Sequence, residues 1–357
     1  MTCPFWLVGL LALACSNAGQ VRNDPAVGGD SGSGHAGVGG TQLTAGGGQA
    51  GAGGAQAGAG SGGVAGGEAG TDAGGAPPAE RCASATPEAC WRGLYLSPYT
   101  DHSGQVTFEG DTAQHLYILD DPQKSDQVLA FIEAQGIDSL SFYDLATLLD
   151  DVELQAKLAS FVQAARARGV IEVNAIGSTY LPAWDAIAAA QLESQLFDGV
   201  VTEIEFWNAS ATFEEFQSVA AHVRGLSMKT PDGREMPLAA YIGWPTPEQV
   251  SALVPLVDRL FVHTYVTSAD LAYDYGQERF AAFAALEPAL EVRPIFSAEG
   301  QAWSAGDEHF MGEWLATHSL AEAEASFLTS WEAEAAAMPV LGGFQYYDYF
   351  YLERYLE

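Results

Sequence analysis

The sequence predicts an α/β protein whose main domain is a (β/α)8 TIM barrel, preceded by a signal peptide and a disordered glycine-rich linker. From Arg92 onward, short runs rich in β-branched and aromatic residues alternate with Ala-, Leu- and Glu-rich segments of helical periodicity. Such alternation favours parallel β/α units, and eight of them within residues 81–357 fit the about 250 residues that this barrel takes. An open doubly wound sheet is disfavoured, because Pro98-Tyr99-Thr100-Asp101 follows the first strand in place of a glycine-rich phosphate loop.

Each predicted element follows from its own residue pattern. The β-rich runs predict strands at Gly93–Ser97, Ser139–Tyr143, Ile171–Ile176, Val200–Trp207, Leu238–Trp244, Leu260–Val266, Glu291–Ser297 and Leu341–Tyr347. The helical periodicity predicts helices at Ser125–Gln135, Val152–Arg168, within Ala183–Leu196, at Thr212–Gly225, near Pro247–Val254, at Arg279–Leu286 and at Leu320–Ala337.

Residues 1–15 are predicted to be an export signal. The apolar run Phe5–Ala14 is too short to span a bilayer but has the length of a signal-peptide core. It ends at Ala12-Leu13-Ala14-Cys15, which resembles the lipobox of bacterial lipoproteins. The resemblance implies that Cys15 is lipidated and that the exported protein meets a membrane only through this anchor, in the outer membrane or at the cell surface of a bacterium. The alternative is a plain secretory signal with an incidental cysteine.

Residues 16–80 are predicted to be a flexible linker. They are rich in Gly, Ala and Ser and have almost no aromatic or β-branched residues, so they cannot bury enough surface to offset the entropy of ordering. Cys82 and Cys90 follow directly and are expected to form a local disulfide in an exported protein. The other interpretation, a pair of metal ligands, lacks neighbouring Cys or His residues to complete the set.

The charge excludes some classes of partner. The chain has 46 Asp and Glu against 14 Lys and Arg, a formal net charge of −32. Such a chain repels the phosphate backbone, so we expect no nucleic-acid partner. The predicted strand ends lack the His and Cys cluster of a zinc site, so we expect no metal. We also expect no cofactor and a monomeric protein.

The carboxyl ends of the predicted strands mark the candidate site, because the chemistry of such barrels lies there. These ends carry carboxylates, aromatic rings and amides, which carbohydrate sites use to protonate glycosidic oxygens and to stack on sugar rings. The predicted catalytic and substrate-binding residues are Asn174, Glu203, Glu205, Trp207, Trp244, His263, Tyr265, Glu299, Tyr347 and Asp348; Tyr95, Tyr143, Tyr241 and Arg293 are also assigned to strand ends.

The fourth strand carries a pair of carboxylates. Glu203 and Glu205 are two residues apart, so on a strand they point to the same side. Two carboxyls held this close raise each other's pKa, and one can stay protonated as a general acid. The alternative is that one or both pair with a structural Arg or Lys, for which this acidic chain offers few partners.

The segment 197–205, FDGVVTEIE, resembles the fourth-strand signature of glycoside hydrolase family 18, the chitinase family. The resemblance implies that Glu205 is the catalytic acid and that Glu203 positions the acetamido group of the substrate. It also implies that Tyr265, in His263-Thr264-Tyr265, assists the acetamido oxygen, while residues 174–178 loosely resemble the third-strand motif that begins at Asn174. Val201 stands where the family has its first aspartate.

A second segment, 294–300 (PIFSAEG), resembles the seventh-strand motif of clan A glycosidases, in which Glu299 would be the nucleophile. Ala209 stands where that clan has its acid glutamate. Because both patterns are altered at a catalytic position, two hypotheses remain open. One is a surface-tethered glycoside hydrolase that cleaves a polysaccharide with Glu205 as general acid. The other is a non-catalytic glycan-binding or structural barrel lipoprotein with a degraded active site.

Overall fold

The computed structural model describes residues 91–98, 107–108, 111–112, 118–298, 310–334 and 338–356. Cys15, Cys82, Cys90 and Glu299 lie outside these residues, as do the predicted signal peptide and linker. The lipidation, the disulfide and the domain boundaries therefore stay predictions. None of the helices in the described ranges is long and apolar enough to cross a membrane.

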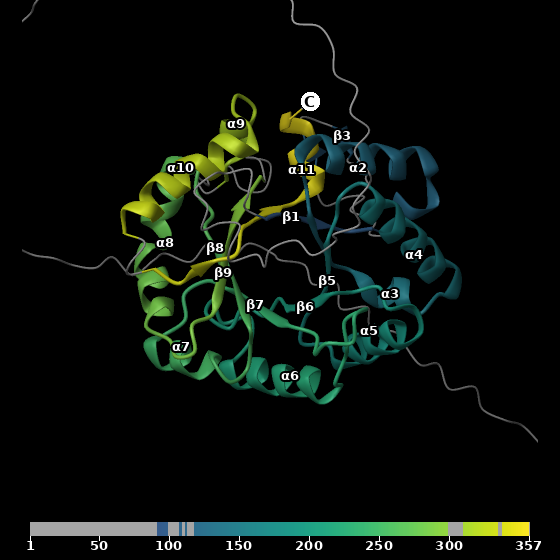
Figure 1. The fold of residues 1–357 in the computed structure, drawn as a ribbon, viewed down its shortest axis with the longest axis horizontal. Coiled ribbons are helices and arrows are strands. Elements are labelled where there is room, and N and C mark those ends of the chain that lie inside the picture. The colour runs from purple at the N-terminus through teal and green to yellow at the C-terminus, as the bar shows by residue number, and fades with distance from the viewer. Residues whose placement is uncertain are drawn as a thin grey trace, which may run out of the picture. The chain divides into compact units, whose positions relative to one another are not determined.

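Eight parallel strands close into a barrel, which confirms the predicted fold class (Figure 1). Each barrel strand pairs with the next barrel strand along the chain, and pairing of the last with the first closes the ring. In spatial order the barrel strands are β1 (Arg92–Leu96), β4 (Ser139–Phe142), β5 (Glu172–Gly177), β6 (Gly199–Thr202), β7 (Leu238–Ile242), β8 (Arg259–His263), β9 (Glu291–Ser297) and β11 (Phe344–Tyr347). The short β10 (Val340–Leu341) also pairs with β9, and β2 (Thr107–Phe108) pairs with β3 (Asp111–Thr112).

Helices surround these strands in Figure 1. Local capping fixes where several of them begin: Thr212 with Glu215, Thr246 with Gln249, and Ser319 with Glu322 each form a capping box that satisfies free backbone amides. The helices are η2 (Ile118–Asp120), α2 (Pro122–Gln135), α3 (Leu145–Leu149), α4 (Val152–Ala167), α5 (Leu181–Ser194), α6 (Phe213–Gly225), α7 (Pro247–Leu253), α8 (Ala269–Ala284), α9 (Gly312–Leu315), α10 (Leu320–Ala333) and α11 (Tyr349–Leu356).

Two predicted boundaries differ most from the structure. Helix α8 begins at Ala269 rather than Arg279 and runs through Gly276. A Cβ at Gly276 would lie 2.3 Å from the ring of Phe280, so the glycine makes room for that ring. Strand β6 ends at Thr202 rather than Trp207. Its last ladder pair joins Thr202 to Gly177, the last residue of β5, and beyond it the chain turns.

The barrel interior has an apolar middle layer. Its buried side chains form a core separate from the larger core between strands and helices. This inner core shows which face of β1, β5, β6, β7, β8 and β9 points into the barrel, and it consists of Tyr95, Ile176, Val201, Ala239, Tyr241, Phe261 and Ile295.

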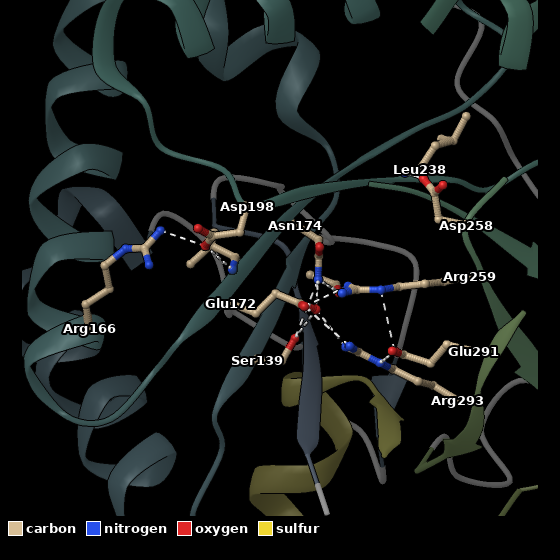
Figure 2. Close-up of polar contacts among 12 residues, drawn as sticks. Ser139, Arg166, Glu172, Asn174, Asp198, Leu238, Asp258, Arg259, Glu291 and Arg293 are labelled. Atoms are coloured by element: carbon tan, nitrogen blue, oxygen red, sulfur yellow. Dashed lines mark hydrogen bonds and ion pairs between the residues drawn. The ribbon is translucent and has the colours of Figure 1, made fainter. Parts of the chain in front are cut away.

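The amino ends of the strands hold an ionic network, which we define as Glu172, Arg259, Glu291 and Arg293 (Figure 2). Glu172 and Arg293 are buried, and Arg259 and Glu291 are partly exposed. Glu172 accepts hydrogen bonds from Arg293 at 2.6 Å and from Arg259 at 2.7 Å, and Glu291 accepts from Arg293 at 2.7 Å. Asn174 also donates to Glu172, at 3.0 Å. Asn174 and Arg293, both assigned to the carboxyl ends from the sequence, thus lie in or against this network instead.

Candidate active site

The carboxyl ends of the barrel strands, which we call the mouth, carry most of the predicted site residues. The side chains keep alternating beyond the end of β6. Ile204 and Phe206 pack in the larger core between strands and helices, whereas Val201 belongs to the inner core. Glu203 and Glu205 are partly exposed and share the inward side with Val201. The two carboxylates therefore lie at the mouth although they stand beyond the end of the strand.

Glu205 is held by neutral hydrogen-bond partners. The side-chain amide of Asn208 and the hydroxyl of Tyr241 hydrogen-bond its carboxyl group. Burial raises the pKa of Glu205, and these two hydrogen bonds oppose the rise without cancelling it. Within the described part of the chain, no Lys or Arg pairs with Glu205. A carboxyl in this setting keeps its proton to higher pH than an exposed one, as a general acid must.

Tyr241 connects Glu205 to the rest of the mouth. Its hydroxyl also hydrogen-bonds Tyr265. Burial raises the pKa of Tyr241 well above its ordinary value, and the charges of Glu205 and Glu203 raise it further, so the hydroxyl stays protonated. Tyr265, Tyr241 and Glu205 thus form a chain of hydrogen bonds across β8, β7 and the end of β6.

Tyr95, in the same inner core as Tyr241, lies near Glu203. Burial raises the pKa of Tyr95 well above its ordinary value, and the charge of Glu203 contributes to the rise. The Tyr95 hydroxyl is buried and has no hydrogen-bond partner among the described residues. A buried hydroxyl in this state is suited to pair with a water molecule or a ligand at the mouth.

Four aromatic rings follow one another around the mouth, and we call them the aromatic row: Tyr143, Tyr347, Tyr265 and His263. The His263 and Tyr265 rings stack with centroids 3.8 Å apart. Tyr347 lies 6.5 Å from Tyr265 and 6.2 Å from Tyr143, again nearly parallel to each. All four side chains are partly exposed, so the row presents ring surface at the mouth.

Two tryptophans extend the aromatic surface. Trp207 packs edge-on against Tyr241, with centroids 5.2 Å apart, and lies so close to Gly243 that a Cβ there would be 2.3 Å from the indole nitrogen. Position 243 therefore requires glycine. Trp244 lies 4.9 Å from His263, and 49% of its surface is exposed.

Asp348 follows β11 on the opposite side of the ring of strands from Glu205. Its carboxylate accepts a hydrogen bond from Tyr143, and the Phe350 and Tyr351 amides at the start of α11 also bond it. Burial outweighs these hydrogen bonds and raises the pKa of Asp348 to about 6. Asp348 therefore joins the aromatic row to the last helix.

The structure brings together Glu203, Glu205, Trp207, Trp244, His263, Tyr265, Tyr347 and Asp348 at the mouth, while Glu299 lies outside the described residues. Tyr95, Tyr143 and Tyr241 also lie there, as the sequence predicts for these strand ends, although it gives none of the three a catalytic or substrate-binding role. Each of these tyrosines stands in or next to the end of a predicted strand, and the period-2 alternation of its strand would have placed it on the inward face.

Among the described residues, no group of three or more His, Cys, Asp and Glu side chains is placed to hold a metal ion.

No family model matches the chain, and no curated protein matches it either. Similar solved structures include a family 18 chitinase from Pseudoalteromonas aurantia, with a TM-score of 0.44, 13% identity and coverage of 73% of this chain and 94% of that one. They also include the ICChI chitinase from Ipomoea carnea, with a TM-score of 0.42, 13% identity and coverage of 74% of this chain and 97% of that one. A family 113 β-1,4-mannanase has a TM-score of 0.42, 10% identity and coverage of 73% of this chain and 88% of that one. One of these structures is a chitinase of family 18, the family that residues 197–205 resemble. Because these TM-scores are low, we infer the function from the residues of the mouth.

Proposed function

We propose that the protein is a glycoside hydrolase with Glu205 as its general acid. The observation that carries the proposal is the setting of the Glu205 carboxyl, which is partly buried at the mouth, bonded only by neutral groups, and raised in pKa by burial. Cleavage of a glycosidic bond needs a carboxyl that begins protonated and gives its proton to the leaving oxygen.

The surroundings of Glu205 favour a sugar as the substrate. The aromatic row and Trp244 offer ring faces on which the apolar face of a sugar can stack. Glu203 and Tyr265 are both near Tyr241, and the family resemblance gives these two residues the task of holding an acetamido group. We therefore propose an N-acetylated glycan as the substrate.

A second function is favoured by one specific observation. Val201 is fully buried in the inner core, at the position where the resembled family has its first aspartate. A valine can neither share a proton with Glu203 nor bond it. This position supports the alternative that the barrel binds a glycan without cleaving it.

The two functions are separated by incubating the purified full chain with N-acetylchitohexaose, mannohexaose and peptidoglycan fragments. Chromatography measures the release of shorter products, and calorimetry measures binding. Turnover of an N-acetylated substrate supports the hydrolase. Binding without turnover supports the glycan-binding barrel, and neither binding nor turnover contradicts both.

Replacement of Tyr241 by phenylalanine is expected to shift the pH dependence of hydrolysis. Activity of a general acid falls as pH rises through its pKa, because the proton is lost. The Tyr241 hydroxyl lowers the pKa of Glu205, so its removal raises that pKa and moves the basic limb of the kcat/KM profile to higher pH. Tyr273→Phe, which removes a hydroxyl bonded to Glu334 at 3.1 Å on the outer helices, is the control and leaves the limb in place. A basic limb that stays or moves to lower pH in Tyr241→Phe contradicts the assignment.

A further inference from the structure

Arg279 of α8 is a buried cation whose described partners are all neutral. Only 8% of its surface is exposed. One guanidinium nitrogen donates to the carbonyl of His263 at 2.6 Å and to that of Gly243 at 3.1 Å, and the other donates to the carbonyl of Tyr275 at 3.0 Å. Within the described ranges, no carboxylate hydrogen-bonds it or forms an ion pair with it.

The other buried arginine of the described chain, Arg293, has the carboxylates of Glu172 and Glu291 as partners. The partly exposed Arg92 likewise donates to the carboxylate of Glu324, at 2.6 Å. The chain has 46 acidic residues, so a carboxylate partner for a buried arginine is easily supplied. Among the described residues, Arg279 differs in being bonded only by backbone carbonyls. Burial lowers the pKa of Arg279 to about 10, which shows that its position is costly for the charged form.

The contacts of Arg279 are on the backbone and rings that shape one side of the mouth. His263 ends β8, and Gly243 directly precedes Trp244 after β7. The guanidinium carbon also lies 4.9 Å from the Trp244 ring centroid and 4.9 Å from that of Tyr275. Trp244 and Tyr275 are in turn edge to face at 5.7 Å. Arg279 therefore touches both strand ends and one face of the exposed tryptophan.

We propose that Arg279 is a positioning residue, which fixes Trp244 and His263 in the orientation that presents a stacking surface to a sugar ring. Arginine suits this task because its planar group stacks on aromatic rings while its fixed fork of donors bonds several carbonyls at once. Lysine has neither the plane nor the fork. The role in sugar binding rests on the proposed function, whereas the positioning of Trp244 does not.

Fluorine NMR of the full chain labelled with fluorotryptophan tests the positioning without any glycan. The chain has 8 tryptophans, and the resonance missing from Trp244→Phe is that of Trp244. In Arg279→Met this resonance is expected to shift and broaden while those of the tryptophans on the outer helices stay. Arg279→Lys is expected to give a smaller change in the same direction. Arg224→Met, on the exposed side of α6 and paired with Asp258, is the matched control and leaves the spectrum of Trp244 unchanged.

Titration with N-acetylchitohexaose tests the consequence for binding. Arg279→Met is expected to raise KM about tenfold with little change in kcat. The stacking interaction stabilises the bound substrate and the transition state equally, so its loss weakens binding without slowing the chemical step. In a barrel that binds without turnover, the dissociation constant rises by the same factor. Trp244→Ala is expected to have at least as large an effect as Arg279→Met.

The outcomes separate this proposal from the proposed function. An unchanged Trp244 resonance in Arg279→Met and Arg279→Lys overturns the positioning role, whatever the glycan result. If the wild-type chain neither binds nor cleaves the oligosaccharide, the proposed function fails while the resonance still decides the role of Arg279. If Arg279→Met does not fold, the comparison is made with Arg279→Lys, in which a rise in KM with unchanged kcat supports the role and an unchanged KM contradicts it.

Discussion

Replacement of Glu205 by glutamine is expected to lower kcat/KM on an N-acetylated oligosaccharide about 100- to 10,000-fold, the usual contribution of a general acid. Glutamine has the same shape and its carbonyl still accepts the hydrogen bond from Tyr241, so the fold and the mouth keep their geometry. What is lost is the proton. Steady-state hydrolysis of N-acetylchitohexaose at several pH values measures the effect, and the pH dependence assigned to Glu205 disappears with it.

Glu235→Gln is the matched control for this experiment. Glu235 is exposed, pairs with Lys229 on the surface and is remote from the mouth residues in the contacts described, so its neutralisation leaves kcat/KM unchanged. If Glu205→Gln turns over substrate as fast as the wild-type chain, Glu205 is not the acid. If both variants and the wild-type chain bind the oligosaccharide equally and none cleaves it, the mouth is a binding site.

The sequence was sufficient to predict the barrel because each strand carries its own signal. Parallel strands buried on both faces are short apolar runs, and the intervening helices have their own caps and periodicity. The pattern was less informative where tertiary contacts decide a boundary. The predicted helix Arg279–Leu286 in fact begins at Ala269, and the ring of Phe280 packs against Gly276 inside it.

The candidate site shows the same division. Alternation along the fourth strand predicted that Glu203 and Glu205 share a side, and this side is the inward one even beyond the last ladder pair. Alternation predicts which face of a strand a side chain occupies, but not how far along the barrel axis it lies. Asn174 and Arg293 face inward as well, but they stand early in β5 and β9 and therefore lie near the amino ends.

The hydrogen bonds between side chains could not be predicted from sequence, because they join residues on different strands. The bond from Tyr241 to Glu205 depends on the relative register of β6 and β7. The structure also shows where two of the few basic residues of the chain are used. Arg259 and Arg293 are taken up by Glu172 and Glu291 at the far end of the barrel, which leaves the carboxyl of Glu205 to neutral partners.

Replacement of Arg293 by methionine is expected to lower the free energy of unfolding by about 3–5 kcal/mol, the usual effect of removing one partner from a buried ion pair. The Arg293 side chain is fully buried, and its loss leaves Glu172 and Glu291 to share Arg259 alone. One negative charge of the ionic network is then uncompensated inside the barrel. Urea unfolding at neutral pH, analysed by the shift in midpoint at constant slope, measures the loss.

The pH dependence of this loss has a definite sign. Burial alone would raise the pKa of Glu172, but Arg259 and Arg293 hold it well below its ordinary value. The wild-type chain therefore has the full stabilising effect of Glu172 above the pKa of an unfolded glutamate, about 4.3, and loses it as pH falls further. The variant behaves in the opposite way, because protonation relieves its unpaired carboxylate. The difference between the two unfolding free energies is thus largest near neutrality and shrinks in acid.

Two further variants decide whether uncompensated charge causes the loss. Arg234→Met breaks an exposed pair with Asp232, which solvent screens, and is expected to leave the free energy of unfolding nearly unchanged. The double variant Arg293→Met with Glu172→Gln restores the balance of charge, so it should recover part of the loss seen in Arg293→Met alone. If the double variant is instead less stable by the sum of the two single effects, the network stabilises the barrel through shape rather than charge. The amino end of the barrel would then be held by stacking of the Arg293 guanidinium on Trp91 and Phe261, since its central carbon lies 4.8 and 5.6 Å from their ring centroids.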